Sequence, residues 1–301
     1  MHTDSKSKAQ DQAAEVLKEC KAQIVATNST LSTDSFHKLL TCINESVNAS
    51  MAKKQEEIDF QETVRLRLGN KLINYACVDP KMKQTTEIEN RTWTFPEEKM
   101  SNQVKVMMDR PNVQIHLILD FISDKECAAV EKAVKVERID GANGLWASKG
   151  GVTIPQTPMS PLLVLARRFY GYARDQLNGI SLEASTSLNS EQLFVLKYSG
   201  KGADAESLDR YEPHCDGACN GEEHKKGDRV ATVIAYCEAP LVGGSTHFNN
   251  AGIHIKPQKG SAIYYSYVDP LTLKADTGFT QHSGCPVIEG DKTIVTHKIR
   301  Y

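Results

Sequence analysis

The last third of the chain alternates short apolar runs with glycine, proline and aspartate. Five such runs follow one another: "EQLFVLKYS", "DRVATVIAYCE", "GIHIKP", "GSAIYYSYV" and "KTIVTHKIRY". Runs of this length, rich in Val, Ile, Tyr and Phe and bounded by turn residues, are typical of β-strands. Many short strands in succession predict a β-sandwich or a β-barrel.

The segment before these strands predicts one further strand and two helices. "VQIHLILDF" has the composition of a strand, and "SDKECAAVEKAV" predicts a helix that opens with a capping box of Ser123 and Glu126. A second helix is expected to start at Ser160, with Pro161 in its first turn, and to end near Gly179. Helices that precede a run of strands favour an α+β fold in which the helices pack on the outside of a β core.

The first seventy residues predict a helical hairpin. Apolar residues recur at helical spacing in two stretches, 16–24 and 36–47, and Ser32, Thr33 or Asp34 can cap the second helix. An elongated hairpin is more often a docking or dimerisation element than a catalytic one, so we expect oligomers to form through these helices. The alternative is a plain packing appendage. We therefore divide the chain into a helical N-terminal region (1–70), a connecting segment with at most one strand (71–112) and a main domain (113–301).

Composition excludes two classes of partner. Of the 301 residues, 40% are hydrophobic and 25% are charged, and the formal net charge is −2. Without a basic excess there is no expectation of a nucleic-acid partner, and no apolar run approaches the length of a membrane span.

Two features concern chemistry of the secretory pathway. The glycosylation pattern N-x-S/T occurs four times before residue 100 and is absent after it, at Asn28, Asn44, Asn48 and Asn90. Cys20 and Cys42 lie at equal distances from the predicted turn, so a disulfide between them and two buried free thiols are both open. The polar first residues lack the apolar core of a signal peptide. We expect either a mature form in the endoplasmic reticulum lumen or outside the cell, or a cytoplasmic protein.

The stretch "RYEPHCDG" places an imidazole and a carboxylate on one face of a strand. Because strand side chains alternate, His214 and Asp216 point the same way and Cys215 points away. A non-haem iron site needs two imidazoles and one carboxylate on one side. His282 is the best candidate for the second imidazole. Ten residues later, Lys292 supplies a cation that can hold the distal carboxylate of an oxo-acid.

In these segments the chain resembles the prolyl 4-hydroxylase family of iron(II)- and 2-oxoglutarate-dependent dioxygenases. "LFVLKYSG", "YEPHCD", "DRVATVIAYCEAPLVGGSTHF", "IKPQKGSAIYYSY" and "HSGCPVIEGDK" follow in the family's order over roughly 113–301. The resemblance implies a double-stranded β-helix, or jelly-roll barrel, for this dioxygenase domain. It implies Fe²⁺ held by His214, Asp216 and His282, and 2-oxoglutarate held by Lys292 with help from Tyr198 and Thr246. Lys298 is expected to matter little for 2-oxoglutarate.

The resemblance also implies a reaction and a substrate. Family members use dioxygen to hydroxylate peptidyl proline, release succinate and carbon dioxide, and require ascorbate. Tyr211 and Arg229 match positions on the side where the proline enters, and they suit an extended proline-containing peptide. Two departures affect this pocket: Thr293 and Ile299 stand where tryptophans are usual, so we expect a looser proline pocket beside Ile299.

Three alternatives remain open at this point. "HCDGACNGEEH" offers His214, Cys215, Cys219 and His224 as a zinc-binding module, although it leaves His282 and Lys292 unexplained. A catalytically silent domain could grip proline-rich peptides. The same enzyme chemistry could act on a single regulatory proline or on another residue type, in place of collagen-like repeats.

Overall fold

The computed structural model describes residues 14–22, 34–50, 52, 82–155, 157, 160–182, 191–202, 205 and 207–301. The chain divides into two compact units, Met1–Asn70 and Lys71–Tyr301, and each is described by itself. No helix in the described ranges is both long and apolar enough to cross a bilayer.

The N-terminal unit contains two helical stretches, residues 14–22 and 34–50. Cys20 and Cys42 form a disulfide between them, which decides between the two possibilities that the sequence leaves open. Phe36 and Leu40 remain 58% and 48% exposed on the second stretch. The predicted turn, with Ser32 and Thr33, lies outside the described residues, so the hairpin stays a prediction.

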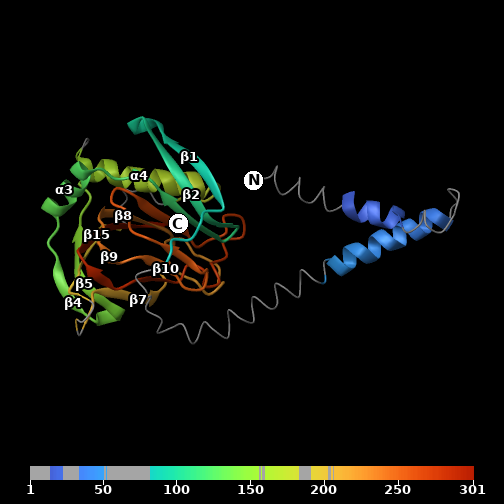
Figure 1. Cartoon of the computed structure of the whole chain (residues 1–301). Helices are drawn as coiled ribbons and strands as arrows, with labels where there is room; N and C mark the ends of the chain where they lie inside the picture. Colours follow the sequence, from blue (N-terminus) through green and yellow to red (C-terminus); the bar gives the residue numbers. More distant parts are fainter. Residues whose placement is uncertain are drawn as a thin grey trace. The chain divides into compact units, whose positions relative to one another are not determined.

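The second unit is built around antiparallel strands and two α-helices, shown in Figure 1. The helices are α3 (Asp124–Ala133) and α4 (Pro161–Gln176), and the strands are β1 (Glu89–Phe95), β2 (Met100–Arg110), β3 (Val113–Ile118), β4 (Glu137–Asp140), β5 (Leu145–Val152), β6 (Leu193–Ser199), β7 (Arg210–His214), β8 (Arg229–Glu238), β9 (Val242–Gly243), β10 (Thr246–Phe248), β11 (Ile253–Ile255), β12 (Ala262–Ser266), β13 (His282–Gly284), β14 (Val287–Glu289) and β15 (Asp291–Arg300).

Eight of these strands have the order of a jelly roll. One layer runs β12-β8-β15-β6 and the other runs β7-β13-β10-β11, and β5 pairs with both β6 and β7 to join them. Numbered along the chain from β6, omitting β9 and β14, the layers read 6-3-8-1 and 2-7-4-5. Successive strands therefore alternate between the layers, except that β10 and β11 are neighbours in the second layer. This arrangement matches the predicted β core, and it brings β7, β13 and β15 around one interior.

The sheet is buried on both of its faces. Val295 and Ile299 of β15 join the apolar cluster beneath α3 and α4, while Ile294 joins the cluster inside the barrel with Tyr265 and Phe248. Figure 1 shows α4 lying across the sheet near β8 and β15, and these elements are in contact. The period of two in β15 therefore assigns each side chain to the helix-covered face or to the interior.

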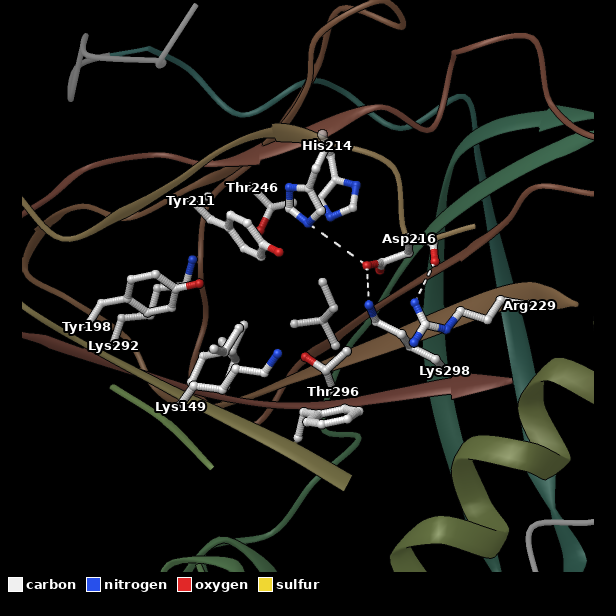
Figure 2. Close-up of a pocket in the computed structure, with 16 residues that line it drawn as sticks. Lys149, Tyr198, Tyr211, His214, Asp216, Arg229, Thr246, Lys292, Thr296 and Lys298 are labelled. Atoms are coloured by element: carbon white, nitrogen blue, oxygen red, sulfur yellow. Dashed lines mark hydrogen bonds and ion pairs between the residues drawn. The ribbon is translucent and has the colours of Figure 1, made fainter. Parts of the chain in front are cut away.

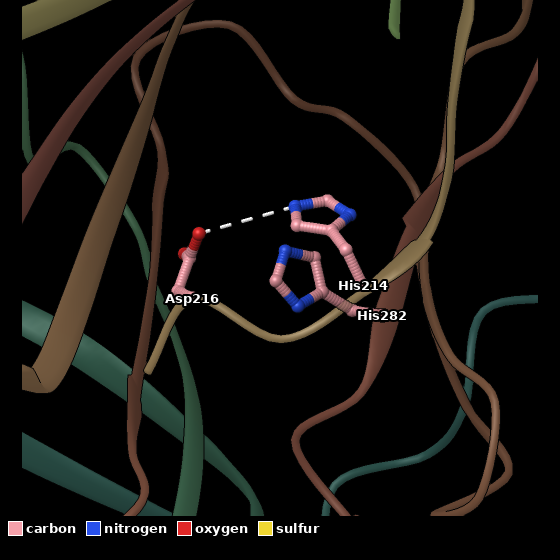
Figure 3. Close-up of side chains that lie close together, drawn as sticks. All are labelled: His214, Asp216 and His282. Carbon is pink, nitrogen blue, oxygen red and sulfur yellow. Dashed lines mark ion pairs between the residues drawn. The ribbon is translucent and has the colours of Figure 1, made fainter. Parts of the chain in front are cut away.

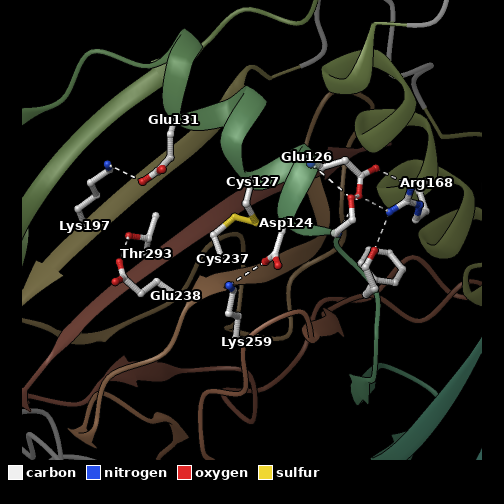
Figure 4. Close-up of a disulfide and its surroundings, with 12 residues drawn as sticks. Asp124, Glu126, Cys127, Glu131, Arg168, Lys197, Cys237, Glu238, Lys259 and Thr293 are labelled. Atoms are coloured by element: carbon white, nitrogen blue, oxygen red, sulfur yellow. Dashed lines mark hydrogen bonds and ion pairs between the residues drawn. A yellow bond between two sulfur atoms is a disulfide. The ribbon is translucent and has the colours of Figure 1, made fainter.

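The predicted helix boundaries are confirmed by the structure. The Ser123 hydroxyl accepts from the backbone N–H of Glu126, whose carboxylate accepts from the Ser123 backbone, so the capping box is present. Pro161 opens α4 after Ser160, as expected. A disulfide between Cys127 and Cys237 joins α3 to β8 (Figure 4). This bond fixes the helix layer to the strand that forms the middle of the sheet.

The region before α3 differs from the expectation. Two strands, β1 and β2, form an antiparallel hairpin and extend the sheet next to β3, where the sequence predicts at most one strand. The polar composition of this segment has a simple cause: β1 is an edge strand, and only Trp93 and Phe95 along it are buried. β4 and β5 are further strands that the sequence does not predict.

Candidate metal and cosubstrate site

The register of two neighbouring strands brings the predicted metal ligands together. His214 ends β7 and His282 begins β13, and the two residues lie opposite each other in the antiparallel pair. Asp216 follows two residues after His214. The three ligand atoms lie within 4.8 Å of one another, and Figure 3 shows both rings and the carboxylate directed at a common point.

Hydrogen bonds orient both imidazoles for metal binding. His214 Nδ1 lies 2.8 Å from the carbonyl oxygen of Glu212, and His282 Nδ1 lies 2.9 Å from that of Thr280. A carbonyl only accepts, so each Nδ1 carries the proton and each Nε2 keeps its lone pair for a metal. The two histidines share this arrangement although they come from different strands.

The protonation states are those that a divalent metal requires. Burial lowers the pKa of His214 to about 3, and burial also lowers the pKa of His282. Burial by itself would raise the pKa of Asp216, but the neighbouring His282 and Lys298 outweigh it and hold that pKa well below its usual range. Two neutral imidazoles and one carboxylate anion fit Fe²⁺ at this place.

Two residues that sequence reasoning did not assign contact the Asp216 carboxylate. Lys298 Nζ lies 2.7 Å from Asp216 Oδ1, and the hydroxyl of Tyr265 donates to Oδ2. The Tyr265 hydroxyl also lies 3.2 Å from His282 Nε2. Both could have been found from the alternation of side chains along a strand, because this alternation directs each of them into the interior of the barrel.

A buried lysine forms the other end of the cavity. Lys292 is 1% exposed, and its Nζ donates to the carbonyl oxygen of Gly244 at 2.6 Å. It pairs across the β15–β6 register with Tyr198, and its Nζ lies 5.1 Å from the centroid of the Tyr198 ring. Burial lowers the pKa of Lys292 to about 7. A cation without a carboxylate partner in the described part of the chain suits an anionic ligand.

The other cosubstrate candidates lie beside this lysine. Tyr198 and Thr246 both line the cavity. The Thr246 hydroxyl hydrogen-bonds the hydroxyl of Tyr236 at 2.8 Å, and Tyr236 also faces Lys292. Sequence reasoning missed Tyr236. All predicted metal and cosubstrate residues therefore border a single cavity, shown in Figure 2.

The two predicted substrate residues differ in the contacts that their side chains make. Tyr211 lines the cavity and stacks on His214, with ring centroids 3.7 Å apart. The Arg229 guanidinium binds both oxygens of Glu191 and donates to the backbone carbonyl of Asp216 at 3.0 Å. These contacts hold the segment that carries Asp216, a predicted metal ligand. A substrate-binding role for either residue stays a prediction.

The expectation about Ile299 is wrong. Ile299 is 2% exposed and packs in the cluster beneath the helices, whereas Lys298 lines the cavity. Side chains of a strand alternate, so Lys292, Thr296 and Lys298 share the interior face and Ile299 cannot. The side chain at this end of the pocket is a charged lysine.

The zinc-binding alternative is also excluded. Cys215 and Cys219 form a disulfide, so neither offers a thiolate to a metal. His224 Nε2 instead lies 3.0 Å from the carbonyl oxygen of Tyr267, away from the histidine–aspartate group.

Comparison with known proteins identifies relatives of this chain. A prolyl 4-hydroxylase subunit alpha-1 from Gallus gallus is 29% identical over 196 residues, which cover 62% of this chain and 35% of the relative. A subunit alpha-2 from Caenorhabditis elegans is 33% identical over 124 residues, or 38% of this chain and 21% of the relative. The chain is related to prolyl 4-hydroxylase alpha subunits. It spans about a third of the length of the first of these relatives, and no protein-family model matches it.

Solved structures were compared as well. A viral collagen prolyl hydroxylase from Paramecium Bursaria Chlorella virus-1, in complex with 2-oxoglutarate, is 26% identical and aligns over 62% of this chain and 95% of the viral chain, with a TM-score of 0.46. A prolyl-4-hydroxylase from Pseudomonas putida is 12% identical over 62% of this chain and 91% of that chain, with a TM-score of 0.41.

Proposed function

We propose that this chain is an iron(II)- and 2-oxoglutarate-dependent dioxygenase that hydroxylates peptidyl proline and releases succinate and carbon dioxide. The observation that carries the proposal is the shared cavity. It joins three ligand atoms within 4.8 Å of one another to a buried lysine that has no carboxylate partner among the described residues. A small diacid that binds the metal through one end and Lys292 through the other accounts for finding both groups in one cavity.

Residues at one end of the cavity would bind the metal, and residues at the other end would bind the distal carboxylate of 2-oxoglutarate. His214, Asp216 and His282 would hold Fe²⁺, which when bound supplies the activation of dioxygen that couples 2-oxoglutarate decarboxylation to C–H hydroxylation. Lys292 would hold the distal carboxylate of 2-oxoglutarate, with Tyr198 and Thr246 beside it. Burial of this end excludes water from the charge pair and strengthens it.

Several contacts keep the metal ligands in place before anything binds. The carbonyls of Glu212 and Thr280 fix the ring orientations, and Tyr211 packs on the face of His214. Glu191 binds both Arg229 and Arg300, and Arg229 in turn holds the Asp216 carbonyl. Because these side chains are already oriented, less conformational entropy is lost when the reactive complex forms.

The acceptor and the compartment belong to the proposal. The relatives are named prolyl 4-hydroxylases, which favours proline in a collagen-like or proline-rich peptide. A polyproline II segment presents its rings regularly and loses little conformational entropy on binding. Asn44, Asn48 and Asn90 are exposed, and every cysteine in the described ranges is disulfide-bonded, so we place the protein in the endoplasmic reticulum lumen or outside the cell.

The test is oxygen transfer to a defined residue. The protein is incubated with Fe²⁺, 2-oxoglutarate, ascorbate and a panel of proline-rich peptides, and mass spectrometry locates any added oxygen. We expect oxygen on proline together with succinate, and loss of both in the variants His214→Ala, Asp216→Ala and His282→Ala. Oxygen only on lysine or asparagine would remove the prolyl assignment, and succinate formation that survives Asp216→Ala would remove the metal assignment.

A further inference from the structure

One wall of the cavity carries positive charge that neither the metal nor 2-oxoglutarate requires. Lys149 of β5 and Lys298 of β15 line the cavity together with Thr296, and Figure 2 shows the three side chains along the same wall. Along β15, Lys298 is six residues from Lys292, which corresponds to roughly 20 Å of strand. This span exceeds the length of a five-carbon diacid held at Lys292.

Two polar groups on this wall have no hydrogen-bond or ion-pair partner in the part of the chain that the structure describes, although Lys149 makes a cation–π contact with Phe194. Thr296 is 5% exposed, and its buried hydroxyl makes no hydrogen bond. Lys149 Nζ lies 4.9 Å from the centroid of the Phe194 ring and makes no hydrogen bond or ion pair with any described residue. A buried hydroxyl without a hydrogen bond and a half-buried ammonium without an anion form an incomplete polar site.

The surroundings of Lys149 are themselves positive. Desolvation lowers the pKa of Lys149, and the nearby charges of Lys298 and Arg229 lower it further, against smaller opposite effects of Asp216 and Glu191. Arg229 is occupied by Glu191. Lys298 is paired with Asp216 while that carboxylate carries its full charge, and a divalent metal on Asp216 would neutralise the same carboxylate. Metal binding therefore leaves Lys298 as well as Lys149 in need of an anion.

We propose that Lys149, Thr296 and Lys298 form a carboxylate subsite, and that the acceptor peptide carries a glutamate or aspartate next to the hydroxylated residue. This inference rests on the proposed function, since it names the substrate class of the same site. A neutral acceptor would cover Lys149 without supplying a counter-charge and would leave Lys298 with a carboxylate that it shares with the metal. An acidic side chain instead supplies charge-assisted hydrogen bonds to both lysines and to the hydroxyl.

The experiment measures peptide binding without turnover. The protein is loaded with Fe²⁺ and 2-oxoglutarate under argon and titrated with fluorescent polyproline-type peptides that differ only in glutamate, glutamine or lysine beside the central proline. We expect the glutamate peptide to bind about tenfold more tightly than the glutamine peptide. Lys149→Met should remove most of this preference, and Lys149→Glu should reverse it toward the lysine peptide.

The matched control is Lys197→Met. Lys197 lies on β6 between two pocket-lining residues, points to the outer surface and pairs with Glu131, so its loss should leave the preference intact. Equal dissociation constants for all peptides, no binding at all, or a preference unchanged in Lys149→Glu would overturn the subsite. Weaker 2-oxoglutarate binding in Lys149→Met with the peptide preference intact would assign the charge to the cosubstrate and also overturn it. Failure of oxygen transfer, in contrast, bears on the proposed function alone.

Discussion

Lys292 lies in an environment that opposes its charge. Its ammonium is fully enclosed, its hydrogen-bond partner is the Gly244 carbonyl, and its pKa is about 7 because of burial. A carboxylate ligand would stabilise the protonated form, so binding of 2-oxoglutarate above pH 7 must be accompanied by proton uptake.

The affinity for 2-oxoglutarate should therefore fall as the pH rises above 7. The dissociation constant of the Fe²⁺-loaded protein is expected to increase by up to about tenfold per pH unit between about pH 7 and 9, since each unit lowers the protonated fraction tenfold. Anaerobic titration at several pH values measures this. In Lys292→Arg the guanidinium stays protonated, so the pH dependence should flatten even if the affinity falls. A flat profile in the unaltered protein contradicts the assignment of Lys292.

Lys298 competes with a metal for Asp216. Its ammonium already lies 2.7 Å from Oδ1, so a divalent ion must displace it or share the carboxylate. We expect Lys298→Met to bind Fe²⁺ about three- to tenfold more tightly under argon, because a partly buried ion pair of about 1 kcal/mol is no longer lost. Lys197→Met again serves as the comparison. Weaker metal binding in Lys298→Met would mean that the lysine orients Asp216 for the metal.

At the scale of elements, the loop after β7 holds Asp216, one of the three proposed metal ligands, inside a small covalent ring. The Cys215–Cys219 disulfide encloses Asp216, while His214 lies just outside it. Gly217 continues the loop where a side chain cannot fit, since an added Cβ would lie 2.3 Å from Tyr267 Cε2. The bridge and the tight contact with Tyr267 together restrict where the carboxylate can point.

Breaking this ring should loosen the metal site. In the double variant Cys215→Ser, Cys219→Ser, Fe²⁺ affinity is expected to fall about tenfold, as for other losses of support around metal ligands. Anaerobic metal titration measures the change. Reduction of the disulfide in the unaltered protein should likewise lower the affinity for Fe²⁺. The control is Cys20→Ser, Cys42→Ser, which removes a bridge in the other unit. Equal affinities in the two double variants would show that the small ring does not position Asp216.

The elements also show what the sequence could predict. The family resemblance located the proposed metal ligands, and the capping box located α3. Strand parity contributed less, because β7 ends at His214 and Asp216 lies in the loop that follows. The pairing of β7 with β13 was not predictable from periodicity, because register depends on contacts between distant segments. The error at Ile299 has a different cause: the residue was placed beside the pocket by its match to a family tryptophan, whereas the alternation along β15 directs Lys298 into the cavity and Ile299 away from it.

At the scale of the whole molecule, the buried lysine of the binding site lowers the free energy of unfolding. The barrel encloses a lysine that would be charged in water, and it gains no carboxylate contact in return among the described residues. Replacing a buried, poorly paired ion by an apolar side chain of similar size is often stabilising by about 1–4 kcal/mol. Lys292→Met should therefore raise the melting temperature of the metal-free protein while it abolishes 2-oxoglutarate binding.

The pH dependence of this stabilisation has a definite sign. The pKa of Lys292 is about 7 in the folded protein, below the 10.5 of an unperturbed lysine, so folding favours the neutral amine. The cost of burying the ammonium is fully present below pH 7 and fades as the pH rises toward 10.5. The difference in unfolding free energy between Lys292→Met and the unaltered protein should accordingly be largest near neutral or lower pH and vanish in alkali. Denaturant titrations at a series of pH values measure it, with Lys197→Met as the exposed control. A difference that is constant with pH would indicate that the gain comes from packing and that folding does not shift the pKa of Lys292.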